Sequence, residues 1–142
     1  MLRDGHNNLK FSRGLSPVAA TTDNTAYVSQ IIDTANFMTC EFVILLGSLA
    51  DADTTLTILV EDGNQSNLSD NATVDASYLI GTSAGAGIQF DSDNKVAKIG
   101  YVGPKRYVRV TITPANNTGN IFLAGVWVQG QPRKRPQSTQ LV

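Results

Sequence analysis

Strict alternation of apolar and polar residues is the feature that most constrains how this chain can fold. In the segment "RYVRVTIT", residues 106–113, the side chains of Val108, Val110 and Ile112 fall on one side, and the residues between them fall on the other. The segment "TTLTILVED", residues 54–62, has the same pattern. Because successive side chains of a strand point to opposite faces of a sheet, both segments are predicted strands with one buried face.

Clusters of turn-forming residues separate about eight segments of this kind. The longest clusters are "DGNQSNLSDNATVD" at 62–75 and "TPANNTGN" at 113–120, and no segment has the 3.6-residue period of an amphipathic helix. The pattern predicts an all-β fold, a single-domain antiparallel β-sandwich that is jelly-roll-like. We expect the sandwich to span residues 18–130, between an extended N-terminal arm at 1–17 and a C-terminal tail at 131–142.

The two strands predicted within residues 95–113 are expected to form a hairpin. The segments "KVAKIGYVG" and "KRYVRVTIT" flank the dipeptide Gly103-Pro104, which is a strong turn signal. Within the second strand, Tyr107 and Arg109 share the outward face.

The strand that begins near Met38 is apolar on both of its faces. Alternate residues from Met38 to Leu46 form one apolar face, and Val43 and Leu45 make the opposite face apolar as well. We therefore expect this strand to be covered on both sides. Cys40, the one cysteine of the chain, lies in this strand and is expected to be a buried and inert thiol. Trp127, in the apolar strand near the C-terminus, is expected in the core.

The low charge of the chain limits the classes of partner. Charged residues make up 16% of the sequence, against roughly 25% in an average soluble protein, so the surface is either Thr/Asn-rich or covered by a partner. The net charge is −1, which does not indicate a specific nucleic-acid partner. The N-terminus lacks the apolar core of a signal peptide, and Phe42–Ala50, the longest apolar run, is too short to span a membrane. A cytosol-like compartment and no membrane are expected.

Residues that could perform chemistry are few. His6, the one histidine, lies in the predicted arm, where nothing would hold a catalytic base in place. The aspartates of "DADTT" and "DSDN" hint at calcium, but a loop that starts at Asp51 has Leu56 where the EF-hand needs glycine. The glycine-rich "GTSAGAG" lacks the lysine and the helix of a phosphate-binding loop. No catalytic, cofactor or metal site is predicted.

Three groups of residues are instead candidates for contact with another protein. Tyr107 and Arg109 on the outward face, with Arg106 at the exit of the predicted turn, are of residue types that are enriched at interfaces, although a solvated Tyr–Arg stack explains them equally well. The basic tail "PRKRP" could dock on an acidic neighbour or simply be solvated. The third group comprises the apolar residues of the arm. The candidate contact residues are Leu9, Phe11, Arg106, Tyr107, Arg109, Arg133, Lys134 and Arg135.

Four segments, in order, resemble a family of small proteins encoded in the head region of tailed bacteriophages. They are "IIDTANF" (31–37), "GSLADADTTLTILVED" (47–62), "IGYVGPKRYVRVTIT" (99–113) and "VQGQPRKRP" (128–136). The resemblance covers about residues 30–136, and its most specific parts are the "GYVG-KRYVRV" element and the "G-PR--P" ending.

This resemblance implies a capsid cement or decoration protein rather than an enzyme. Such a protein has a jelly-roll or related sandwich fold and binds the outside of the major capsid protein lattice. The expected location is the virion capsid surface, after synthesis in the host bacterial cytoplasm, and a homo-oligomer, a dimer or trimer, is expected on symmetry grounds. A neck, tail or fibre adaptor and a carbohydrate-binding module remain open as alternatives, and a hydrolase is the weakest.

Overall fold

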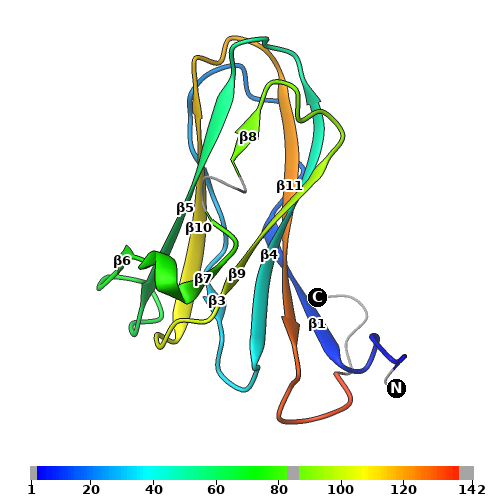
Figure 1. Cartoon of the computed structure of the whole chain (residues 1–142), viewed down its shortest axis with the longest axis vertical. Helices are drawn as coiled ribbons and strands as arrows, with labels where there is room; N and C mark the ends of the chain where they lie inside the picture. The colour runs from blue at the N-terminus through cyan, green and yellow to red at the C-terminus, as the bar shows by residue number, and fades with distance from the viewer. Residues whose placement is uncertain (1–2, 83–86, 138–142) are drawn as a thin grey trace.

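Two antiparallel sheets pack face to face in the computed structural model, which describes residues 3–82 and 87–137 (Figure 1). Sheet A contains, in spatial order, β1 (Leu9–Leu15), β11 (Ile121–Gly130), β4 (Thr39–Leu49), β9 (Val96–Tyr101) and β7 (Leu79–Ile80). Sheet B contains β2 (Tyr27–Val28), β10 (Tyr107–Ala115), β5 (Thr55–Gly63) and β6 (Ala72–Thr73), with β3 (Ile32–Asp33) beside β10 and β8 (Ile88–Gln89) beside β5. One short 3₁₀ turn, η1 (Ala76–Tyr78), precedes β7. The predicted all-β sandwich is confirmed.

The core fills the space between the sheets and follows the predicted alternation. Val108, Val110 and Ile112 are fully buried, and they lie opposite the inward residues of sheet A. Phe42 packs against Trp127 with ring centroids 4.7 Å apart and planes tilted by 60°. The predicted core position of Trp127 is therefore confirmed, and the burial of Cys40 is confirmed as well.

The predicted hairpin at Gly103-Pro104 is wrong. β9 pairs with β4 and β7 in sheet A, whereas β10 pairs with β5 in sheet B, so residues 102–106 cross from one sheet to the other. A Cβ on Gly103 would lie 2.6 Å from the Tyr101 ring, so glycine lets the chain pass tightly over that ring. From β7 to β11 every successive strand changes sheet, which is the jelly-roll-like element of the topology.

The N-terminal segment is not an arm throughout. Residues 9–15 form β1, which pairs with β11 from Leu9↔Gly130 to Leu15↔Gly125 and forms an edge of sheet A. Sequence reasoning missed this strand because its apolar residues are scattered among polar ones, and a bulge lies between Arg13 and Leu15.

The described part of the C-terminal tail is attached to the base of the sandwich. The Arg133 N–H donates to the Asn36 carbonyl at 2.9 Å, and the Gln137 N–H donates to the Asn7 carbonyl at 3.0 Å. Figure 1 shows the described end of the tail on the same side of the molecule as the start of β1. Residues 138–142 of the predicted tail, residues 1–2 of the predicted arm, and residues 83–86 of the glycine-rich connection lie outside the described residues.

The two long sides of the sandwich differ. On the β1 side, the Gln30 N–H donates to the Gly14 carbonyl, and the Gln30 carbonyl accepts from Trp127 Nε1 at 3.1 Å, so the chain bridges the two sheets there. On the opposite side, β9 of sheet A and β8 of sheet B border an open cavity. No helix among the described residues is long and apolar enough to cross a membrane.

Candidate protein-binding surface

The outer face of sheet A is apolar across its four longest strands. The strand register places Val126 beside Val43, Ala124 beside Leu45, and Leu45 beside Val96, so these side chains share one face. Several are widely exposed: Val96 by 62%, Leu45 by 50% and Phe122 by 45%. We call this surface the apolar face and define it as Phe11, Val43, Ile80, Leu45, Val96, Phe122, Ala124, Val126 and Val128.

The apolar face corrects one expectation from the sequence. The strand around Val43 and Leu45 was expected to be covered on both sides, but only its inner face, with Phe42 and Ile44, is buried. Met38, which was expected to begin this strand on the same face as Phe42 and Ile44, lies before β4 and is 75% exposed. None of the described residues packs over Leu45.

The size of this uncovered surface is at the upper end of what a soluble monomer exposes. Four strands of 7, 10, 11 and 6 residues, spaced about 4.8 Å apart, present an outer face of roughly 540 Å², its polar positions included. The largest apolar patch on a typical soluble monomer is about 300–600 Å² and is often a binding site. One side of a standard protein interface buries about 800 Å², so the apolar face and its border match that scale.

A small number of charged residues border the apolar face. Arg13 and Lys98 are exposed beside Val126 and Val43, and Glu41 is half-buried in the neighbouring row. Within the described residues, the two ion pairs both lie on sheet B, so neither Arg13 nor Lys98 is neutralised. The border is therefore mainly cationic.

The predicted patch of Arg106, Tyr107 and Arg109 lies on the outer face of sheet B, where its charges are paired. Arg106 Nη2 and Asp33 Oδ2 are 2.8 Å apart, and Arg106 Nε donates to Asp33 Oδ1 at 3.0 Å. The guanidinium lies 5.2 Å from the centre of the Tyr107 ring. The hydrogen bonds between Arg106 and Asp33 lower the pKa of Asp33 and raise the pKa of Arg106.

Arg109 has the more enclosed ion pair of the two. Its Nη2 lies 2.8 Å from Glu61 Oε2, and the side chains of Arg109 and Glu61 are only 26% and 14% exposed. Internal pairing accounts for these residues without a partner, so their role in protein contact stays a prediction.

The other predicted contact residues lie apart from this patch. Phe11 is 46% exposed and belongs to the apolar face, whereas Leu9 is half-buried at the start of the same strand. Arg133, Lys134 and Arg135 are exposed at the base of the sandwich. The structure thus divides the predicted residues among three surfaces. Sequence reasoning did not identify Val96 and Phe122 as parts of a binding surface. The available signal was the strand around Val43 and Leu45, which is apolar on both of its faces.

The residues considered for chemistry have structural roles. Burial raises the pKa of the Cys40 thiol to about 12, which keeps it protonated and unreactive at neutral pH. The Asp51 carboxylate accepts from the N–H groups of Asp53 and Thr118, and the Asp93 carboxylate accepts from the Leu49 N–H at 2.7 Å. In the described ranges no three His, Cys, Asp or Glu residues are grouped as a metal site would need.

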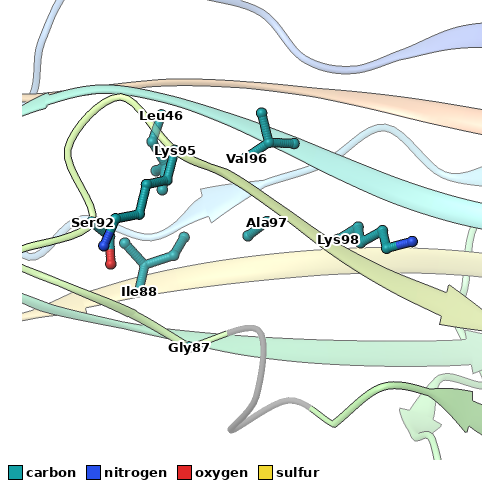
Figure 2. Close-up of a pocket in the computed structure, with 8 residues that line it drawn as sticks. All are labelled: Leu46, Gly87, Ile88, Ser92, Lys95, Val96, Ala97 and Lys98. Atoms are coloured by element: carbon teal, nitrogen blue, oxygen red, sulfur yellow. The ribbon is translucent and has the colours of Figure 1, made fainter.

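A cavity of about 330 Å³ opens between the edges of the two sheets (Figure 2). Leu46, Ile88 and Ala97 supply apolar lining, and Ser92, Lys95 and Lys98 supply polar atoms. In Figure 2 the Lys95 side chain extends toward Ser92, while Lys98 points away along β9.

The fold and its surfaces define an all-β sandwich with a large uncovered apolar face. No protein-family model and no curated protein matches the chain. Among solved structures, the PBSX exported protein XepA is similar with a TM-score of 0.52 and 14% identity, over 94% of this chain and 42% of that one. The chain therefore shares the fold of XepA and spans less than half of its length.

Carbohydrate-binding modules are also similar, at lower scores. Xyl-CBM35, solved with a glucuronic acid containing disaccharide, has a TM-score of 0.43 and 12% identity, over 97% of this chain and 98% of that one. The CBM22-1–GH10 modules of Clostridium thermocellum xylanase 10B, complexed with xylohexaose, have a TM-score of 0.43 and 9% identity, over 96% and 28%.

Proposed function

We propose that the chain is a structural virion protein of a tailed phage, a capsid cement or decoration protein that binds the major capsid protein on the outside of the head. The observation that carries the proposal is the uncovered apolar face of sheet A, which needs a protein partner to leave water. The resemblance of four sequence segments to phage head-region proteins supports the same role, and the fold shared with XepA is compatible with it.

The physical requirements of such a role agree with this surface. A cement protein stabilises a lattice by adding contacts that must be broken before neighbouring capsomers separate. An apolar face on a rigid sheet loses little conformational entropy on binding. Many copies on one lattice add avidity, and self-association into a dimer or trimer would suit the symmetry of the sites.

The test compares two matched leucine substitutions in phage particles. Leu45→Glu places a charge at the centre of the apolar face, and Leu59→Glu makes the same change at an exposed leucine of sheet B. We expect Leu59→Glu particles to carry copies nearly stoichiometric with the major capsid protein and Leu45→Glu particles to carry few. Wild-type occupancy by a folded Leu45→Glu chain would refute the proposed binding surface.

The number of copies also separates the proposal from its alternatives. A count of about six or twelve per particle would assign the chain to the neck, tail or fibre. Specific binding to a glycan array, without any incorporation into particles, would support a carbohydrate-binding module instead. The proposal involves binding without catalysis and requires no specific nucleic acid.

A further inference from the structure

One edge of sheet A has unpaired backbone groups beside the cavity between the sheets. β9 pairs with β4 along its whole length from Val96 to Tyr101, but β7 pairs with β9 only at Gly100 and Tyr101. The outer edge of β9 from Val96 to Ile99 therefore has no strand beside it among the described residues.

The hydrogen bonds at the two ends of β9 show which groups point to this edge. The Leu46 N–H donates to the Lys95 carbonyl toward β4, and the Val102 N–H donates to the Tyr78 carbonyl toward β7. Because backbone groups alternate between the two sides of an antiparallel strand, the N–H and C=O groups of Val96 and Lys98 point outward. Both residues thus offer a hydrogen-bonding template to an added strand.

The cavity gives an added strand a place for one side chain. Ala97 lies between Val96 and Lys98 along β9. Its side chain faces the space between the sheets, where it lines the cavity with Ile88 and Leu46. Its small side chain leaves the cavity of about 330 Å³ open. On the opposite side of the sandwich, the backbone of Gln30 is instead linked to Gly14 and Trp127 of sheet A by hydrogen bonds. A partner side chain opposite Ala97 would fill this opening.

Charge decides what kind of strand fits. Lys95 and Lys98 border the cavity, and neither forms an ion pair within the described residues. The nearest acids in sequence are the exposed Asp91 and Asp93, and the carboxylate of Asp93 already accepts from the Leu49 N–H. Pairing two β9 edges from two copies would bring four lysines together, so an acidic partner is favoured over a second copy.

We infer that the free edge of β9 binds an extended, acidic segment of another protein by strand addition, with one apolar side chain inserted between Ala97 and Ile88. That side chain then lies between the two sheets, and the acidic residues on either side of it point to the outer face of sheet A, beside Lys98. This backbone edge adjoins the apolar face, to which Val96 belongs, but the inference does not depend on the proposed capsid role.

Hydrogen exchange on the purified chain tests the inference without any particle. The probe is a capped nine-residue peptide, Thr-Glu-Thr-Glu-Phe-Glu-Thr-Glu-Thr, and the control peptide has lysine in place of each glutamate. We expect the acidic peptide at saturation to slow exchange of the Val96 and Lys98 amides at least about tenfold, and the lysine peptide to leave them unchanged.

Two substitutions of Lys98 separate the contribution of its backbone N–H to peptide binding from that of its side-chain charge. Lys98→Pro removes the outward N–H while leaving the pairing of Ala97 and Ile99 with β4, so it should abolish binding. Lys98→Thr keeps the N–H and removes the charge, so it should weaken binding several-fold without abolishing it.

Three results would overturn the inference. One is protection of the Val96 and Lys98 amides before any peptide is added, which would mean that the chain covers its own edge. Another is the absence of peptide binding up to about 1 mM. The third is binding that leaves these two amides unprotected. The exchange measurement uses the wild-type chain and stands even if Lys98→Pro fails to fold.

Discussion

Removal of the Tyr101 hydroxyl should destabilise the protein by an amount that the structure fixes. This hydroxyl, on β9 of sheet A, donates to Asp62 Oδ2 on β5 of sheet B at 2.7 Å and accepts from the Lys105 N–H at 3.1 Å. It is thus a direct polar link between the two sheets. The substitution Tyr101→Phe keeps the ring that packs over Gly103 and removes only the oxygen.

The expected loss follows from the burial of the acceptor. Asp62 is 7% exposed, and the Tyr101 hydroxyl is the one side-chain donor to its carboxylate among the described residues. A hydrogen bond to a charged group contributes about 1.5–3 kcal/mol, and a buried partner left unsatisfied adds to the loss. We expect the free energy of unfolding to fall by about 2–3 kcal/mol, which lowers Tm by roughly 6–10 °C for a chain of this size.

Urea unfolding followed by circular dichroism measures this change. The control is Tyr78→Phe. Because Tyr78 is 42% exposed, removal of its hydroxyl should change the free energy of unfolding by less than about 0.5 kcal/mol. A Tyr101→Phe chain as stable as the control would refute the reasoning, since the Asp62 carboxylate would then need no partner from sheet A.

The same residue makes a prediction for alkaline pH. Burial, and then the hydrogen bond to Asp62, raise the pKa of Tyr101 well above its ordinary value. A raised pKa means that the stabilisation is complete below the unfolded-state pKa of about 10 and is lost as the pH rises beyond it. The wild type should therefore lose more stability than Tyr101→Phe between about pH 10 and pH 11.

Three further predictions concern the core, the turns and the surface. Gly14→Ala should cost about 1–3 kcal/mol, because its Cβ would overlap the ring of the buried phenylalanine of β4; Gly5→Ala, with an ordinary contact of 3.6 Å, is the control in thermal unfolding. Asp70→Asn should lower Tm at pH 7, because the backbone N–H groups of Asn64 and Gln65 donate to the Asp70 carboxylate and lower its pKa. This stabilisation is present above about pH 4 and is lost as the pH falls, so the Tm values of the variant and the wild type should converge near pH 2. The double substitution Tyr107→Ala and Arg109→Ala removes the ion-pair partner of the Glu61 carboxylate on the outer face of sheet B, so it should lower Tm and leave the copies per particle unchanged; fewer copies of a folded chain would show that this face also contacts the capsid.

Alternation in the sequence predicted the core because burial on one side of a strand imposes a period of two. Val108, Val110 and Ile112 were identified in this way, and each is fully buried. The same reasoning succeeded for Trp127 and Cys40, since an apolar strand interior leaves few other positions for them.

Strand partners were not predictable in the same way. A turn signal such as Gly103-Pro104 shows that the chain changes direction, but it does not show whether the next strand pairs with the last or joins the other sheet. Here the chain crosses to sheet B, with Gly103 close against the Tyr101 ring, and the turn signal is the same for either outcome. The edge strand β1 was missed because one partner strand leaves much of it exposed and polar.

The binding surface was misjudged for a related reason. The apolar residues on both faces of β4 predicted a cover over Leu45, and the described residues supply none. A sequence pattern records that a face avoids water without recording whether the cover comes from the same chain.

The pairing of β1 with β11 has a consequence for how the molecule reaches its native state. β11 lies between β1 and β4, so sheet A has no continuous order of strands until residues 121–130 are present. Contacts between such distant parts of a chain form slowly, because a long loop must close before they contribute. A growing chain that ends before Ile121 would keep β1 unpaired and expose the edge of β4. Folding should therefore follow synthesis of β11, and truncations within that strand should abolish the fold as a whole.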